Sequence, residues 1–598
     1  MPNTTAHVLQ SLLWPEPGIS TERELYLRLS GPVAWSMTRR QLTFACGGGA
    51  GFDTASNLFN LGKWRRHCGL QDLHLRLNGA GRFELQVFWV AQDRSHERLY
   101  NEPIDLTPGQ PLRIDLTETL PAAVATGELV QFSLHALGDG LLTDAAWETT
   151  MPPRQLPQLA VSITTFKREA AVRASVTRFE DFMAHSPLAS HFHLIVVDNG
   201  QSAEIQASAN VTPIANRNLG GSGGFARGLL AAKARGASHC LFMDDDASVH
   251  MGALERAWTF LAYASDPKTA VAGGIAMANH RWALWESGAV FDRQCHALWH
   301  GTDLRAFAEV ATMELASTGP KPHTYYGGWW FFAFAIAEAK YRPFPFFVRG
   351  DDVSFSIANQ FEIVTLPGIV CFQDADFTEK ESPLTHYLDL RSHLAHHLAL
   401  PSMDIGRWGT LGIVVKFFLR GLLQCHYDTL AARNLALKDV LRGPAFFAET
   451  ADMAERRADL ARLRTTEVWA PVTAPLPPTR RRIDPRDNLF WRWLLNLTFN
   501  GHLLPFFGYW GNQITLSSGQ RGHLPDVWGA ARITYVSTDG TQTFSVRHSK
   551  WAALRQAAKT VPGVLKLFLT YGKIRQTWQR GYQEIATDDF WREKLGLR

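Results

Sequence analysis

The sequence predicts an α/β fold: a doubly wound parallel sheet, preceded by an N-terminal β-sandwich and followed by a mainly helical C-terminal domain. Three patterns predict it: period-two alternation before residue 150, continuous apolar strands alternating with helices from residue 159, and helical periodicity after residue 400. A chain of 598 residues is too long to fold around a single hydrophobic core. We therefore expect three domains, at 1–155, 156–400 and 401–598.

The N-terminal region is expected to consist of short antiparallel strands. Polar and apolar residues alternate at 73–77, 83–89 and 112–116, as in strands with one buried face. Asn-Gly-Ala-Gly at 78–81 and Pro-Gly-Gln-Pro at 108–111 are typical turn sequences. Short strands separated by such turns favour a β-sandwich.

The middle region has the pattern of a parallel sheet. Strands and helices are expected to alternate as strand 159–164, helix 169–184, strand 193–198, helix 223–235 and strand 240–243. Strands that are apolar throughout are buried on both faces, with helices as crossovers. Ligands bind such sheets beyond the carboxyl ends of the strands. Residues 198–200 and 244–246 are therefore expected to share one site.

The C-terminal region is expected to be helical, with one small β element. The predicted elements are helices at 411–423 and 432–463, an exposed proline-rich connection at 471–485, and a hairpin of strands 531–535 and 543–546. Asp539-Gly540 between the two strands is a strong hairpin-turn signal.

Composition limits the class of protein and its location. The formal net charge of +4 is small for this length, so nucleic acid is not an expected partner. Neither a signal peptide nor an uninterrupted run of eighteen apolar residues is found, and we expect a cytoplasmic location. Aromatic residues at 489–510 and basic residues at 555–580 suit peripheral contact with the cytoplasmic face of the inner membrane. Helix packing is the alternative for both segments.

The most informative stretch is 218–227, Asn-Leu-Gly-Gly-Ser-Gly-Gly-Phe-Ala-Arg, which precedes an apolar strand ending in Asp244, Asp245 and Asp246. Glycines let backbone N–H groups approach a phosphate. Carboxylates beyond a strand end can hold the divalent cation that phosphates require. The glycine-rich segment or the Asp triplet alone would be weak evidence for a phosphate site. Their order in the sequence predicts a site for a nucleotide diphosphate with Mn²⁺ or Mg²⁺.

Four motifs carry a family resemblance. The glycine-rich segment, the Asp triplet, Gly328-Trp329-Trp330 and Gly350-Asp351-Asp352, in this order, resemble the mycobacterial-type polymerising galactofuranosyltransferases of glycosyltransferase family 2. The similarity extends to the β-rich region and covers most of the chain. It implies a GT-A fold for the catalytic domain, inverting transfer, UDP-galactofuranose as donor, and a growing, lipid-linked cell-surface glycan as acceptor. A homo-oligomer is compatible with it.

The donor side is expected to be built from two groups of residues. By resemblance, Asp244 contacts the nucleotide and Asp246 the metal; alternate carboxylates at a strand exit can also share a cation with two phosphates. A helix cap or a solvated turn is the alternative. The other residues expected at the nucleotide sugar are Arg168, Asn199, Asn218, Gly220, Gly221 and Asp245. Asn199 stands where the family has Gln, and a structural turn is the alternative for this second group.

The chain departs from the family where a metal-binding His is expected. Gln373 stands near that place, and its carbonyl oxygen suits Mg²⁺ better than Mn²⁺. Asp374 or His386 could also supply the missing ligand.

Asp351 and Asp352 are the expected catalytic pair. An inverting transfer needs a carboxylate that removes the proton of the acceptor hydroxyl. Adjacent carboxylates do not usually point the same way, so one is expected to be the base and the other to position an acceptor hydroxyl. The family assigns the base to the second residue, Asp352. A helix N-cap explains the pair equally well.

The acceptor side is expected to include Trp329 and Trp330, which would stack on a sugar as in the family or lie in the core. Glu286 lies three positions before Ala289, where the family has a carboxylate, and Asp389 replaces a family His. These changes leave the acceptor and the linkage open.

Three functions are therefore weighed. The leading one is a metal-dependent, inverting transferase of galactofuranose. The second keeps the scaffold with another nucleotide sugar or acceptor, which the altered Gln373 and Asp389 motivate. The third is a glycan-binding or assembly protein whose catalytic half has decayed; the retained Asp residues argue against it.

Overall fold

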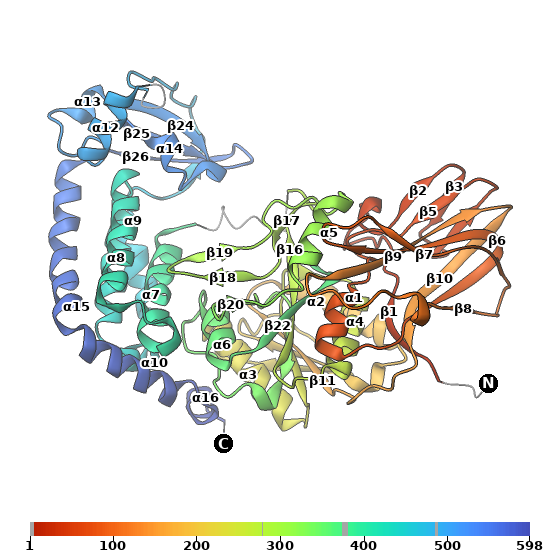
Figure 1. Cartoon of the computed structure of the whole chain (residues 1–598). Helices are drawn as coiled ribbons and strands as arrows, with labels where there is room; N and C mark the ends of the chain where they lie inside the picture. The colour runs from red at the N-terminus through yellow and green to blue at the C-terminus, as the bar shows by residue number, and fades with distance from the viewer. Residues whose placement is uncertain (1–4, 278, 374–380, 485–487, 598) are drawn as a thin grey trace. The chain divides into compact units, whose positions relative to one another are not determined.

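The computed structural model describes residues 5–277, 279–373, 381–484 and 488–597. It divides into two compact units (Figure 1). The first unit comprises Met1–Asn218, Gly224–Arg342 and Phe355–Asp374; the second comprises Leu219–Gly223, Pro343–Ser354 and Ala375–Arg598. The predicted α/β class with a helical C-terminal region is confirmed.

Ten strands form the N-terminal part of the first unit. They are β1 (His7–Ser11), β2 (Arg28–Ser30), β3 (Val33–Ser36), β4 (Gln41–Phe44), β5 (Gly49–Gly51), β6 (His74–Ala91), β7 (Glu97–Leu106), β8 (Leu112–Asp115), β9 (Glu128–Ala136) and β10 (Gly140–Thr149). The ring of Trp147 on β10 meets that of Phe132 on β9 edge to face, with centroids 5.8 Å apart. Because these residues are not ladder partners, the contact joins two facing layers, as a β-sandwich requires.

The 18-residue strand β6 belongs to both layers. Its first half pairs with β8 and β10, and its second half with β7 and β9. The prediction of a turn at 78–81 is therefore wrong. The glycines serve close packing instead: a Cβ on Gly79 would lie 2.2 Å from the carbonyl oxygen of Leu141, and Gly81 has φ +110°. A sequence that suits a chain reversal also suits a bent strand.

A mixed sheet forms the centre of the first unit, with strand order β13-β12-β11-β14-β21-β16-β22-β15 and β17 paired to β16. The strands are β11 (Leu159–Thr165), β12 (Phe192–Asp198), β13 (Val211–Ala215), β14 (His239–Asp244), β15 (Ala247–Ser248), β16 (Thr269–Ala276), β17 (Leu284–Glu286), β21 (Phe332–Ala335) and β22 (Glu362–Gln373). A separate small sheet holds β18 (Ala289–Phe291), β19 (Cys295–Ala297) and β20 (Tyr325–Tyr326).

The predicted alternation of strands and helices is confirmed in this region. The helices are α1 (Leu61–Lys63), α2 (Glu169–Met183), α3 (Gly220–Ala234), α4 (Met251–Tyr263), α5 (Phe307–Ala316) and α6 (Asp351–Asn359). β11 pairs in parallel with both β12 and β14. An aromatic core that includes Phe225, Phe242, Phe334 and Phe355 is buried against the sheet. The carboxyl ends of the parallel strands are thereby fixed side by side.

The second unit is built on the mutually packed helices α7, α8, α9 and α15. Its helices are α7 (Pro383–Ala399), α8 (Gly406–Leu423), α9 (Tyr427–Val440), α10 (Pro444–Glu449), α11 (Ala454–Leu463), α12 (Leu489–Leu497), α13 (Phe507–Trp510), α14 (Leu524–Val527), α15 (Lys550–Ile585) and α16 (Asp588–Leu595). The prediction of one helix over 432–463 is wrong. Gly443 has φ +90° and Pro444 begins α10, a combination that ends one helix and starts another.

The predicted C-terminal hairpin is confirmed and belongs to a four-stranded sheet. Its strands are β23 (Ala470–Pro471), β24 (Asn512–Ser517), β25 (Ala530–Val536) and β26 (Gln542–Arg547). β25 and β26 pair antiparallel around Gly540, whose φ is +72°. β24 pairs in parallel with β25, which the sequence pattern did not predict. Within the described residues, no helix is long and apolar enough to cross a membrane.

Candidate active site

The Asp triplet begins at the last residue of β14, at the carboxyl edge of the central sheet. Thr164 of β11 lies opposite Asp244 of β14, so the chain passes over the end of β11 as β14 finishes. The hydroxyl of Thr165 donates to Asp245 at 2.7 Å. Burial raises the pKa of Asp245, and this hydrogen bond opposes the rise. Parallel pairing thus places the triplet at the edge where ligands bind in such sheets.

Arg168, which precedes α2, reaches the same carboxylates. Its guanidinium forms an ion pair with Asp246, and Nη1 lies 3.6 Å from Asp245. Arg168 is among the residues expected from the sequence at the nucleotide sugar. The structure brings Arg168 to the expected metal-binding carboxylate, where its positive charge balances the negative charge of the triplet.

Gln373 lies beside Asp246 because the short strand β15 pairs with the end of β22. β15 and β22 place Ala247 opposite Gln373, and Nε2 of Gln373 donates to Oδ2 of Asp246 at 3.3 Å. Asp374 lies outside the described residues. His386 lies on α7 in the second unit, with Nε2 at 3.8 Å from Glu381.

These oxygen ligands fit a hard divalent cation. Mg²⁺ is usually held by one or two carboxylates together with substrate phosphates, not by a complete protein cage. Asp244, Asp246 and the amide of Gln373 provide this kind of partial set. Within the part of the chain that the structure describes, no three His, Cys, Asp or Glu side chains could hold a metal ion by themselves.

The loop after β12 is organised by Asp198. Its carboxylate accepts the backbone N–H groups of 200–203 at 2.7–2.8 Å. Asn199 is buried, and its side-chain oxygen accepts a hydrogen bond from Asn216 at 2.8 Å. Asn218 follows on the next segment and is half-buried. Asn199 thus has a structural contact in addition to its predicted place at the donor.

In the second unit, the first glycines of the glycine-rich segment pack against the segment that precedes Asp351 and Asp352. Gly220 has φ +72°, and a Cβ there would lie 2.1 Å from the carbonyl oxygen of Phe347. The backbone N–H of Ser222 donates to that same oxygen at 3.1 Å. Only glycine allows this backbone conformation and this close approach.

Ser222 also holds the first residue of the acid pair. It is fully buried, and its Oγ donates to Oδ2 of Asp351 at 2.9 Å. Burial raises the pKa of Asp351 to about 7 and that of Asp352 to about 6. The charge of Asp352 raises the pKa of Asp351 further, whereas Arg349 lowers that of Asp352. Raised carboxyl pKa values near neutrality are those of a general base.

Arg349 and Asp389 form an ion pair beside the acid pair. Nη1 of Arg349 lies 2.9 Å and 3.1 Å from the two carboxylate oxygens of Asp389 on α7. The next residue, Gly350, has φ +91°, and a Cβ there would lie 2.7 Å from Ser392 and 2.8 Å from His396. Asp389 thus fixes an arginine whose charge acts on Asp352.

The expected acceptor residues have different environments. Trp329 is buried, and its ring packs edge-on against Phe225 and Phe242 in the core. Trp330 is partly exposed and donates from Nε1 to the carbonyl oxygen of Gly273 at 2.8 Å. Glu286 is buried at the end of β17. Of the two tryptophans, Trp330 is therefore the better placed to meet a ligand.

Sequence reasoning missed Ser222 and Arg349. Ser222 is the only residue with a hydroxyl among five residues otherwise occupied by glycine, at 220–224. That isolated hydroxyl was a usable signal, because a loop selected only for flexibility has no need of it. Arg349 directly precedes Gly350-Asp351-Asp352, and a cation beside two carboxylates is a second signal of this kind.

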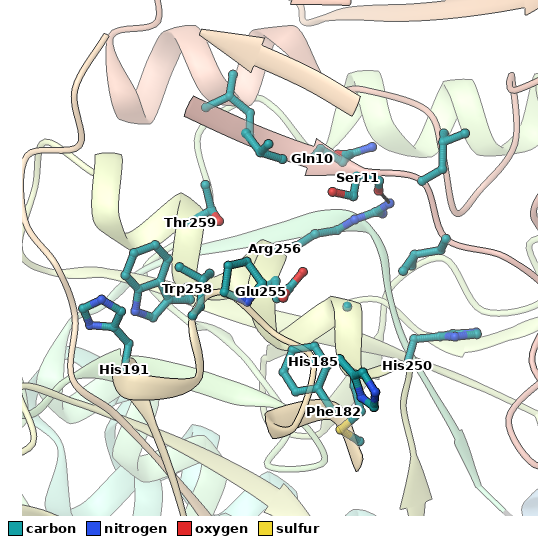
Figure 2. Close-up of a pocket in the computed structure, with 18 of the residues that line it drawn as sticks. Gln10, Ser11, Phe182, His185, His191, His250, Glu255, Arg256, Trp258 and Thr259 are labelled. Atoms are coloured by element: carbon teal, nitrogen blue, oxygen red, sulfur yellow. Dashed lines mark hydrogen bonds between the residues drawn. The ribbon is translucent and has the colours of Figure 1, made fainter. Parts of the chain in front are cut away.

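A large cavity of the first unit lies between β1 and the helices α2 and α4 (Figure 2). Its volume is about 1050 Å³. Arg256 extends across it toward Ser11 and donates to the backbone oxygens of Ser11 and Pro367, each at 2.7 Å. His250 lies between Glu16 and Tyr26, at 3.1 Å and 2.6 Å. Since these polar groups bond to the protein itself, they join the β-sandwich to α4.

The comparisons with known proteins agree with the motifs. Residues 160–335 match the family model described as glycosyl transferase family 2. Galactofuranosyltransferase GlfT2 of Mycobacterium tuberculosis is 26% identical over 517 residues, which cover 80% of this chain and 79% of that protein. GlfT2 of Mycolicibacterium smegmatis is also 26% identical, over 79% of this chain and 77% of that protein. The predicted resemblance is confirmed.

Among solved structures, the mannosyltransferase PcManGT of Pyrobaculum calidifontis, in complex with GDP-Man and Mn²⁺, is 15% identical. The match covers 52% of this chain and 86% of that chain, with a TM-score of 0.27.

Proposed function

Because the chain is a glycosyltransferase with a family 2 domain at residues 160–335, we propose that it moves galactofuranose from UDP-galactofuranose to a hydroxyl of a growing glycan, with inversion. The observation that carries the proposal is the likeness to two galactofuranosyltransferases over about 80% of the chain. The glycine-rich segment with the Asp triplet, and the pair Asp351 and Asp352, supply the groups that such a transfer needs.

Asp352 is proposed as the general base. Burial raises the pKa of Asp352, which makes its carboxylate a stronger base than an exposed one and lets it take a proton from a sugar hydroxyl. The hydroxyl oxygen forms a bond to the anomeric carbon as the bond from that carbon to the diphosphate breaks on the opposite face. The proton passes to Asp352, and the electron pair of the broken bond leaves with UDP. Asp351 would position the acceptor through a second hydroxyl.

Asp244, Asp246 and Gln373 are proposed to hold Mn²⁺ or Mg²⁺ together with the diphosphate. When bound, the cation would neutralise the negative charge that develops on the departing UDP. Arg168, already paired with Asp246, would add a further positive charge at the phosphates. Asn199, Asn218, Gly220 and Gly221 keep their predicted roles at the nucleotide sugar.

The acceptor is proposed to be lipid-linked, with the protein on a membrane surface. Large apolar side chains that are exposed gather around α12 and α13: Leu489, Phe490, Trp493, Leu503, Phe506 and Tyr509. Aromatic residues that project into solvent suit the interface of a bilayer. They would keep the enzyme near an acceptor that cannot leave the membrane.

A related activity with a different acceptor is the second candidate. The ion pair of Asp389 with Arg349 stands where the family has a His, so hydrogen bonding to the acceptor would differ. A screen of UDP-sugars and dTDP-sugars for thermal stabilisation separates the two, because a ligand of the folded state raises Tm. The proposed donor should stabilise most.

The main test is UDP release from UDP-galactofuranose, Mg²⁺ or Mn²⁺ and a galactofuranosyl acceptor. Asp246→Ala should abolish release by removing a ligand of the metal, and Asp352→Asn should lower kcat by at least about 100-fold. Both variants should retain the circular dichroism spectrum and Tm of the parent within a few degrees. Unchanged turnover in both would contradict the roles assigned.

A further inference from the structure

A groove of about 770 Å³ in the second unit is lined by α9, α11 and α15. We call it the α15 groove. Five cationic side chains line it: Lys438, Arg442, Arg462, Lys559 and Lys566. Leucines of α9 and α11 supply its apolar walls. The groove thus combines apolar surface with a concentration of positive charge.

Among the residues that the structure describes, most of this charge has no carboxylate partner. Arg462 pairs with Asp459, the one carboxylate of the lining, at 2.7 Å. Arg442 lies over the ring of Phe446, at 3.9 Å from its centroid. Among the described residues, Lys438, Lys559 and Lys566 have no carboxylate within ion-pair distance. Like charges that gather without partners repel one another, and an anion would relieve that repulsion.

The floor of the groove is a close contact between α15 and α9. A Cβ on Gly563 would lie 2.7 Å from Cδ2 of Leu437, so glycine lets the two helices approach. Pro562 lies inside α15 and has no N–H to donate to the carbonyl of Ala558. The carbonyl of Ala558 therefore lacks its usual helical donor beside the groove, although α15 continues through Pro562.

The same helix exposes an apolar stripe to solvent. Trp551, Leu554, Val561, Leu565 and Leu569 are all exposed, and their spacing of three, seven, four and four residues places them along one face of α15. Lys559 and Lys566 adjoin the stripe in the sequence and line the groove. An exposed apolar face flanked by lysines is typical of helices that lie in the interface of an anionic membrane.

We propose that the α15 groove binds the phosphate head group of an anionic membrane lipid while the apolar stripe lies against the acyl chains. The charges select an anion, and the adjoining stripe selects an amphiphile over a soluble phosphate. The site rests on the membrane location of the proposed function, but its test needs neither donor nor turnover. A failure here and a failure of the transferase proposal can therefore be told apart.

The test is sedimentation of the full-length protein with vesicles of phosphatidylcholine, with or without a fifth of phosphatidic acid. The parent protein should bind the anionic vesicles at least about tenfold more tightly. Lys559→Gln/Lys566→Gln should weaken that binding roughly 30-fold, and Lys438→Gln roughly fivefold, because each cation near the surface contributes a comparable factor. Lys438 distinguishes the groove from helix α15 alone, because it lines the groove from α9.

Lys268→Gln/Lys340→Gln removes the same two charges from the first unit and should leave binding unchanged. All variants should keep the parent Tm. If the groove variants match this control, or if Lys438→Gln has no effect while the α15 variant does, the groove is not the site. Equal stabilisation by inorganic phosphate, without preference for anionic vesicles, would also overturn the proposal.

Discussion

Ser222→Ala tests whether a residue of the glycine-rich segment controls the ionisation of the acid pair. The change removes one buried hydroxyl that donates to Oδ2 of Asp351 at 2.9 Å and leaves the backbone hydrogen bond to Phe347 in place. A hydrogen bond to a charged group contributes about 1.5–3 kcal/mol. At about 1.36 kcal/mol per pKa unit, its loss should raise the pKa of Asp351 by about 1 to 2.

The assay is the pH dependence of kcat/KM for the acceptor. Because Asp351 is proposed to position the acceptor as a carboxylate, its protonation should also contribute to the acid limb. That limb should move to higher pH in Ser222→Ala, with a loss of about 10-fold or more at pH 7 that is recovered toward pH 9. Ser354→Ala is the matched control: Ser354 is fully buried and lies in α6, but its hydroxyl donates to the backbone oxygen of Asp351 at 3.3 Å. Its acid limb should not move.

A second readout does not depend on turnover. The folded pKa of Asp351, about 7, lies above its ordinary value, so the folded state binds the proton more tightly and stability falls as pH rises from about 4 to 7. Ser222→Ala should extend that fall to higher pH by about 1 to 2 pH units, and in an Asp351→Asn background it should not. The charges of Asp352 and Arg391 act on Asp351, and the charge of Arg349 acts on Asp352. A loss of rate and stability equal at every pH would refute the reasoning.

Three further predictions concern the proposed metal site, the glycine-rich segment and a buried ion pair. Gln373→His should raise affinity for Mn²⁺ relative to Mg²⁺ by about tenfold, because imidazole suits Mn²⁺ better than an amide does; metal-dependent thermal shifts measure it. Gly220→Ala should lower UDP affinity and cost about 1–3 kcal/mol, since its Cβ would meet the carbonyl of Phe347; calorimetry with UDP and urea unfolding check both. Lys63→Met should cost about 3–5 kcal/mol in urea unfolding, because it leaves Glu314 charged and buried without the ammonium now 2.6 Å away.

Local patterns predicted those parts of the fold that depend on neighbours in the sequence. The strand 159–164 and the Asp triplet follow from apolar runs that end abruptly, and β11 and β14 confirm both. The turn at 78–81 was wrong because glycines permit either a reversal or a bend, and only the partner strands decide between them. Local sequence does not contain that information.

The missed contacts of the candidate site are long-range. Ser222 and Asp351 are 129 residues apart, and Gln373 and Asp246 are 127 apart. Gln373 could be recognised from the sequence as an amide near the expected ligand, and the lone hydroxyl of Ser222 among glycines was a signal that the sequence offered but the reasoning missed. Their partners could not be read, because the pairing of β15 with β22 is set by packing of the whole sheet.

The length of β6 has a mechanical consequence for the N-terminal domain. One strand supplies hydrogen bonds to both layers, with residues 74–80 in one ladder and 81–91 in the other, so opening either layer disturbs the strand on which the other is built. Amide hydrogens of β8 and β10 should then exchange with solvent at the same rate as those of β7 and β9 under conditions that favour global opening. The domain should melt in a single step and transmit a pull on one layer directly to the other.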